Sequence, residues 1–215
     1  MIRYAATLLF AYSAVVLGSS EEMHRVNGSL SVDPGQQVGD VSTVNGSITV
    51  GSRARVDGAE TVNGSIRLDA GAAARAVETV NGSITIAEDG TVTEGVEAVN
   101  GKVRLARGAR VGGALENVNG EFRIEGAFVG GGIRTMNGDI HVGTGSRVEG
   151  GIHVEKTQGR NWPWQGREDP PRITIESGAV VTGPLRFERE VDLYVGEGVT
   201  LGPVSGVEPR RHALP

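Results

Sequence analysis

An Asn-Gly pair preceded by Val or Met recurs seven times along this chain, at intervals of eighteen or nineteen residues. The repeated asparagines are Asn27, Asn45, Asn63, Asn81, Asn100, Asn119 and Asn137. A short, fixed period kept over more than half of a chain is typical of a solenoid, in which each repeat forms one coil stacked on the last. The period therefore constrains the architecture far more tightly than the function.

A finer period of six residues runs inside each repeat. It begins with Val26 and Val32, continues in steps of six to Leu68, and resumes at Val80. Three such steps fill one coil, so each coil should have three faces. The pattern predicts an all-β fold: a single-stranded parallel β-helix, triangular, with about 18 residues per coil. About nine coils spaced about 4.8 Å apart would form a rod roughly 43 Å long.

The alternation of apolar and polar residues predicts which side chains form the core. Between Val44 and Val50 the apolar residues are Val44, Ile48 and Val50, so these three should face inward. The valine before each Asn-Gly pair, such as Val62, is therefore expected in the core. One inward column should contain Leu30, Ile48, Ile66, Ile84, Val103, Phe122 and Ile140. A second should contain Val32, Val50, Leu68, Ile86, Leu105, Ile124 and Val142.

The Asn-Gly pairs have two interpretations. Asn and Gly suit bends, and Asn side chains stacked one coil apart can hydrogen-bond along the axis, which predicts a structural turn ladder. Asn-Gly-Ser beginning at positions 27, 45, 63 and 81 also matches the N-glycosylation pattern. The repeat spacing explains all seven asparagines, including those followed by Lys102, Glu121 and Asp139, so the structural interpretation is favoured.

The composition narrows the class of protein. With 34 glycines and 4% aromatic residues, the chain suits a narrow core of thin layers. The absence of cysteine excludes disulfides and cysteine-ligated zinc. The net charge of −5 and the lack of a basic run with interleaved aromatics argue against nucleic-acid binding. No nucleophile elbow, phosphate loop or dinucleotide fingerprint occurs, so we expect no cofactor and no enzymatic activity.

The first twenty residues have the pattern of a secretory signal peptide. Arg3 precedes a largely apolar stretch over residues 4–17, which ends in Gly18, Ser19 and Ser20. This stretch is shorter than the about 20 residues that a membrane-spanning helix needs. The pattern predicts a signal peptide over residues 1–20 and a periplasmic or secreted protein. The alternative is a protein anchored in the membrane through residues 4–17.

Breaks in the repeat divide the rest of the chain. Residues 21–154 should form seven coils, residues 155–171 a loop insertion, and residues 172–202 the final coils. Residues 203–215 contain three prolines with Arg210 and Arg211, and this tail is expected to stop strand stacking. The first coil would then have open backbone edges while the last is closed. This difference predicts self-association through the N-terminal coil, as a head-to-head dimer.

Two family resemblances follow from the repeated segments. The Val-x-Gly segments at 54–58 and 146–152 resemble the bactofilins, bacterial polymer-forming proteins built as right-handed triangular β-helices. Thr-Val-Asn-Gly-Ser-Ile at 43–48, 61–66 and 79–84 resembles the adhesin-type β-solenoids of bacterial envelopes. These resemblances imply a right-handed coil and a non-enzymatic structural or interaction role in the cell envelope. They supply no catalytic residue.

The six-residue period also resembles the hexapeptide acyltransferases, which are left-handed β-helix enzymes with a histidine base. An enzyme of this type is the alternative function. The histidines of the repeat region, His141 and His153, are twelve residues apart and should lie on different faces of the coil. We expect them to be solvated surface residues and not a metal pair.

Two outward columns of charge are further candidates for binding. Four carboxylates occupy equivalent places before the repeat valine and should stack one coil apart, where like charges repel. They are Glu60, Glu78, Glu97 and Glu116. A divalent cation could relieve the repulsion, which makes them weak metal candidates, but we expect solvated or arginine-paired side chains and no metal. The column of Arg67, Arg104 and Arg123 is the surface that an acidic envelope polysaccharide would contact.

Trp162 and Trp164 flank Pro163 within the loop insertion. Exposed tryptophans on such a loop would form a binding loop for a glycan or a protein, whereas buried ones would cover the final coils. The second interpretation is the simpler one.

Overall fold

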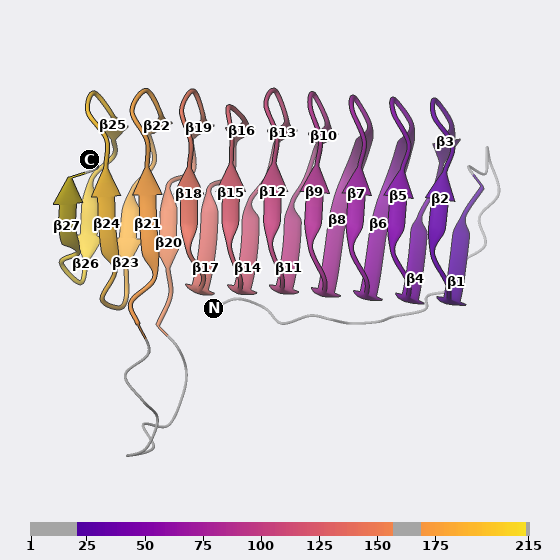
Figure 1. Ribbon diagram of the computed structural model, residues 1–215, viewed down its shortest axis with the longest axis horizontal. Helices are drawn as coiled ribbons and strands as arrows, with labels where there is room; N and C mark the ends of the chain where they lie inside the picture. Colours follow the sequence, from indigo (N-terminus) through magenta and orange to yellow (C-terminus); the bar gives the residue numbers. More distant parts are fainter. Residues whose placement is uncertain (1–20, 157–168, 214–215) are drawn as a thin grey trace, which may run out of the picture.

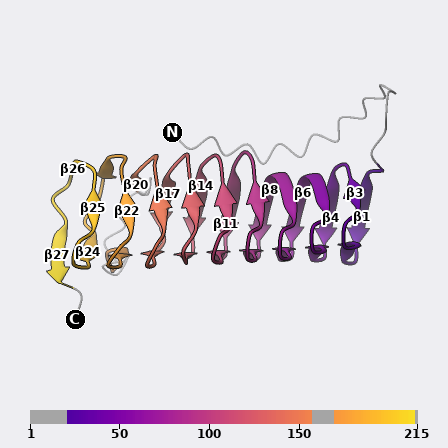
Figure 2. The same ribbon diagram turned by 90° about the horizontal axis from the view of Figure 1, so that it is seen from above.

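The computed structural model describes residues 21–156 and 169–213, and its regular structure is entirely β. Each coil contributes strands to three stacks, and equivalent strands of successive coils pair in parallel, which gives a single row of coils (Figures 1 and 2). Paired residues are 18 apart in the first coils, as in Met23 with Val41, and 19 apart in others, as in Val77 with Val96. This confirms the predicted β-solenoid of about nine turns. No helix of the described residues is long and apolar enough to cross a membrane.

Stack 1 is a ten-stranded sheet. Its strands are β2 (Leu30–Val32), β5 (Ile48–Val50), β7 (Ile66–Leu68), β9 (Ile84–Ile86), β12 (Val103–Leu105), β15 (Phe122–Ile124), β18 (Ile140–Val142), β21 (Arg172–Ile175), β24 (Asp192–Val195) and β27 (Arg210–Ala213).

Stacks 2 and 3 form one seventeen-stranded sheet, because two long strands run through both: β6 (Arg55–Asn63) and β8 (Ala73–Asn81). Stack 2 otherwise has β3 (Gln37–Val38), β10 (Thr91–Val92), β13 (Arg110–Val111), β16 (Phe128–Val129), β19 (Arg147–Val148), β22 (Val180–Val181) and β25 (Thr200–Leu201). Stack 3 otherwise has β1 (Met23–Asn27), β4 (Val41–Asn45), β11 (Val96–Asn100), β14 (Leu115–Asn119), β17 (Ile133–Asn137), β20 (Ile152–Val154), β23 (Leu185–Phe187) and β26 (Val204–Gly206).

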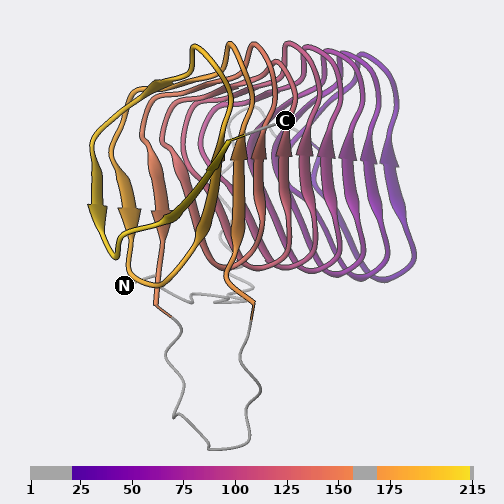
Figure 3. The ribbon, with the colours of Figure 1, turned by 60° about the vertical axis from the view of Figure 1, so that its left-hand side comes forward.

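The solenoid is right-handed. Figure 3 brings the C-terminal coils forward: the chain rises along stack 1, crosses stack 2 and descends along stack 3 as successive coils approach the viewer. This path is counter-clockwise towards the viewer, which is the right-handed sense. The hand agrees with the one that the bactofilin resemblance implies.

The core is a narrow stack of apolar layers inside the coils. Both inward columns predicted for stack 1 are buried, with Leu30, at 5% exposed, the most accessible member. Their residues lie in register, as in the pairs Leu30 with Ile48 and Ile48 with Ile66. Each buried aliphatic side chain contributes about 1.5–3 kcal/mol, so the layers are sufficient without many aromatic residues.

The predicted inward position of the valine before each Asn-Gly pair is wrong. Val62 is half-buried on the outer face of stack 3, and the buried residues in the stack 3 part of the same strand are Ala59 and Thr61. The hydroxyl of Thr61 donates a hydrogen bond to the carbonyl of Gly46 at 2.9 Å. Because this bond satisfies the hydroxyl, threonine is tolerated inside. At the Asn-Gly bend the alternation of inward and outward side chains is interrupted. The alternation in stack 1 therefore does not predict which residues of stack 3 face inward.

The coils continue on both sides of the insertion. β20 pairs with β23, and β18 pairs with β21, so the strands on either side of residues 157–168 remain stacked. Trp162 and Trp164 lie outside the described residues.

The expectation that the C-terminal tail stops strand stacking is also wrong. β26 pairs with β23 and β27 pairs with β24, so the tail forms the last coil. Pro203 and Pro209 directly precede strand segments, where a missing N–H is tolerated. The carbonyl of Pro203 still accepts a hydrogen bond from Leu185 at 2.9 Å. The described part of the rod therefore begins and ends with strands that pair on one side only.

Candidate functional site

The seven repeat asparagines form one hydrogen-bonded column at the corner between stacks 3 and 1. From Asn45 onward, each side-chain Nδ2 donates to Oδ1 of the asparagine in the preceding coil. The distance is 3.0 Å for five of these bonds and 3.2 Å for the bond from Asn137 to Asn119. All six bonds point the same way along the rod, so the column has a donor end and an acceptor end.

Arg189 occupies the acceptor end of the asparagine column. Its guanidinium donates to Oδ1 of Asn137 and, at 3.3 Å, to the carbonyl of Met136. Arginine has donors and no acceptor, so it requires an oxygen at this position. The bond therefore sets the direction of the column and leaves Nδ2 of Asn27 at the opposite end, without a partner among the described residues.

The four candidate glutamates stack in register on the outer face of stack 3: Glu60 beside Glu78, Glu78 beside Glu97, and Glu97 beside Glu116. Partial burial, and then the charges of neighbouring glutamates, raise the pKa of both Glu78 and Glu97. Across residues 21–156 and 169–213, no group of three or more His, Cys, Asp or Glu residues is arranged to hold a metal ion. The column is thus a strip of repelling carboxylates.

The same outward column becomes basic beyond Glu116, with Arg134, His153 and Arg186 in register. Arg134 lies 2.6 Å from Glu116, and Nε2 of His153 lies 3.1 Å from Glu188. The hydrogen bond from His153 is the main reason why the pKa of Glu188 is lowered, followed by the backbone N–H of Lys156. Arg186 lies 3.2 Å from the same Glu188, so each of these three side chains already contacts a carboxylate.

A shallow pocket of about 190 Å³ lies beside this basic part of the column. Glycines form its floor: a Cβ added to Gly150 would lie 2.3 Å from the backbone carbon of Gly131. Arg134, His153 and Arg186 line its wall. Because carboxylates already pair with Arg134 and Arg186, the pocket offers no unpaired arginine to an anion.

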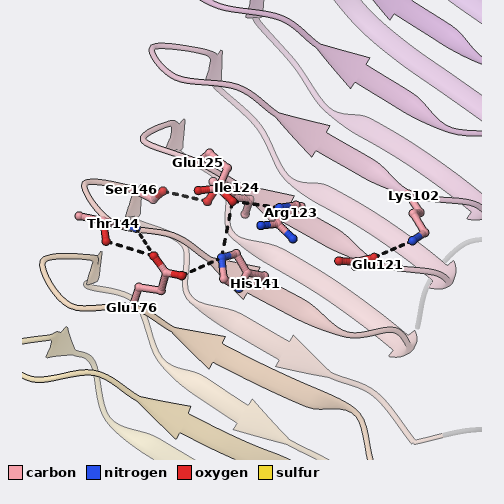
Figure 4. A network of polar contacts seen from close by, with 9 residues as sticks. All are labelled: Lys102, Glu121, Arg123, Ile124, Glu125, His141, Thr144, Ser146 and Glu176. Carbon is pink, nitrogen blue, oxygen red and sulfur yellow. Dashed lines mark hydrogen bonds and ion pairs between the residues drawn. The ribbon is translucent and has the colours of Figure 1, made fainter. Parts of the chain in front are cut away.

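His141 lies on stack 1 between two carboxylates of flanking coils (Figure 4). Its Nε2 is 3.2 Å from Glu176 and 3.6 Å from Glu125, both ion-pair distances, although neither contact has hydrogen-bond alignment. Glu176 also accepts hydrogen bonds from the N–H and the hydroxyl of Thr144, each at 3.1 Å. The backbone bond is the largest cause of the lowered pKa of Glu176.

The two histidines lie on different stacks, His141 in β18 and His153 in β20. Both lie on the outer face, but their side chains are only 20% and 27% exposed because each contacts carboxylates. Glu176 and Glu188 both follow the insertion in sequence, whereas the histidines precede it. Each histidine therefore links the coils before the insertion to the coils after it.

The arginine column on stack 1 is partly neutralised. Arg67 pairs with Asp69 at 2.7 Å, and Arg123 pairs with Glu125 at 3.0 Å. Arg104 lies in register between Thr85 and Arg123. Along with the nearby Lys102–Glu121 pair at 2.9 Å, seen in Figure 4, this face alternates in charge.

Sequence reasoning missed one feature of the rod ends. Among the described residues, Val26 at 61% and Val207 at 42% are the large hydrophobic side chains that stay exposed. Val26 belongs to the first coil and Val207 to the last. The exposure follows from the outward position of the valine before each Asn-Gly pair. The six-residue period of apolar residues instead suggested that this valine faces inward.

Comparisons with known proteins give no match to this chain, neither among family models, nor among curated proteins, nor among solved structures.

Proposed function

We propose that this chain is a non-enzymatic, self-associating structural or interaction protein of the bacterial cell envelope. The observation that carries the proposal is the open edge of the N-terminal coil. In the described part of the chain β1 pairs with β4 alone, and β2 with β5 alone. Such an edge presents a row of unpaired backbone groups to which a further strand can add.

The hand of the coil supports a bactofilin-like or adhesin-like protein over the alternative of a hexapeptide acyltransferase, whose coils are left-handed. The surroundings of His141 agree with this choice. Its Nε2 lies between Glu176 and Glu125 of flanking coils, where it holds coils together. No contact of the described residues favours the enzyme.

An envelope polysaccharide is a second class of partner, through the arginine column of stack 1. Because Asp69 and Glu125 already pair with Arg67 and Arg123, this column supports a polysaccharide less well than the open edge supports self-association. We place self-association first for this reason.

The envelope location rests on the signal-peptide pattern of residues 1–20, which lie outside the described residues. Expression in a bacterial host, cell fractionation and mass determination of the product test it. We expect a periplasmic or secreted product that begins near Glu21. An uncleaved chain in the cytoplasm would refute the location.

Size-exclusion chromatography with light scattering, followed by electron microscopy, tests self-association. The parent should have a mass above that of the monomer, rising with concentration. Val32→Pro should give monomers, because Val32 is buried in the edge strand β2 and proline disrupts it. The control is Ala70→Pro, at an exposed turn position that corresponds to Pro34 of the first coil. A parent that is monomeric at every concentration would contradict the proposal.

A further inference from the structure

The exposed valines at the two ends of the rod belong to one outward column. Val26 is the first of the residues that directly precede the Asn-Gly pairs, one in each coil. The others are Val44, Val62, Val80, Val99, Val118 and Met136. The register of β17, β20, β23 and β26 continues the series through Glu155 and Glu188 to Val207. The interior members of this series are half-buried or, at Met136 and Glu155, buried, whereas Val26 and Val207 are exposed because among the described residues each has a neighbouring coil on one side only.

The inward residues at the same ends are also complementary. Met23 and Val204 occupy the first and last positions of one inward column of stack 3 and pack only partly buried against the core. On stack 2, Val38 is the buried residue of β3, and Leu201 of β25 is a partly buried member of the core. Between two copies stacked end to end, these pairs would continue the apolar layers.

The asparagine column distinguishes the two possible directions of stacking. Its donor end is Nδ2 of Asn27, directly after Val26. The exposed Glu208 directly follows Val207 and carries only acceptors when ionised. In a head-to-tail joint the amide donor therefore meets a carboxylate. In a head-to-head joint both copies present the donor end of the asparagine column, so the column has no carboxylate partner in the other copy.

The C-terminal edge of stack 3 is formed by β26, which pairs with β23. β26, with Val204, Ser205 and Gly206, has small residues that leave its edge accessible.

We infer that copies of this chain join head to tail, the last coil of one copy stacking on the first coil of the next. This inference rests on the self-association proposed above and replaces the head-to-head dimer expected from sequence. A head-to-tail contact joins two different surfaces, so each addition leaves the same pair of surfaces free, and the assembly is an open polar rod.

Disulfide crosslinking tests the direction directly, because the chain has no cysteine of its own. The variants are Val26→Cys and Val207→Cys in the full chain, oxidised separately and as a mixture. Adjacent coils lie about 4.8 Å apart, within the range of about 4.4–6.8 Å between Cα atoms that a disulfide accepts. We expect crosslinked dimers from the mixture and none from either variant alone. Val62→Cys, inside the rod, is the matched control and should not crosslink.

The outcomes separate this inference from the proposed function. Crosslinking of Val26→Cys with itself would overturn the head-to-tail direction while leaving self-association intact. Absence of crosslinks in every sample, with light scattering showing assemblies, would overturn end-to-end stacking. Absence of crosslinks with monomers throughout would remove the self-association on which the inference rests.

Discussion

Glu78→Gln tests whether the glutamate column of stack 3 destabilises the fold. Glu78 lies in register between Glu60 and Glu97, and burial followed by these two charges raises its pKa. The exposed Arg75 opposes this effect. Directly opposed side-chain pairs are worth about 0.2–1 kcal/mol each, and solvent screens this column, so removing two repulsions should stabilise the fold by about 0.5–1 kcal/mol near neutral pH.

The pH dependence of this gain has a definite sign. The pKa of Glu78 is higher in the folded state than in the unfolded state. The protonated carboxyl therefore contributes stability below the unfolded-state pKa, and this stability is lost as the pH rises through the folded-state pKa. The parent and Glu78→Gln should be equally stable in acid, and the variant should become the more stable one towards neutral pH.

Thermal unfolding followed by circular dichroism from acid to neutral pH, at low and high salt, measures the effect. For a chain of this size 1 kcal/mol corresponds to about 2–4 °C in Tm. High salt should shrink the difference. The control is Glu94→Gln, which removes an exposed carboxylate paired with Arg75 at 3.0 Å and should not stabilise. A gain that is absent at neutral pH, or constant with pH, would refute the repulsion.

Two further predictions concern the linkage across the insertion and the phase of stack 3. Glu188→Gln should destabilise the fold at neutral pH, because the pKa of Glu188 is lowered in the folded state. The difference in Tm between the parent and the variant should disappear as the pH falls through that pKa. A difference in Tm that does not change with pH would contradict this prediction. Ala59→Asp should abolish the cooperative unfolding transition because it buries an unpaired carboxylate, whereas Val62→Asp on the outer face should shift Tm only slightly. Equal losses of stability in the two variants would show that the assignment of Ala59 as inward and Val62 as outward is wrong.

The sequence alone determined the coil and much of the candidate site. A fixed period places equivalent residues on neighbouring strands, so the inward columns from Leu30 and Val32 and the contact between successive asparagines follow from spacing. The glutamate column followed for the same reason, since Glu60, Glu78 and Glu97 are one coil apart. The period predicts these contacts because each coil contacts only the coils next to it. Residues one period apart are therefore neighbours in space although they are far apart in sequence.

Only the tertiary structure decided the features that depend on bends, ends and the insertion. The Asn-Gly bend shifts the alternation of stack 3, so Thr61 faces inward and Val62 outward. The insertion conceals the register that brings Glu176 to His141 and Arg189 to Asn137, and the second contact sets the direction of the asparagine column. The last coil is formed by a proline-containing segment whose strands are stabilised by pairing with β23 and β24, which no local propensity reveals.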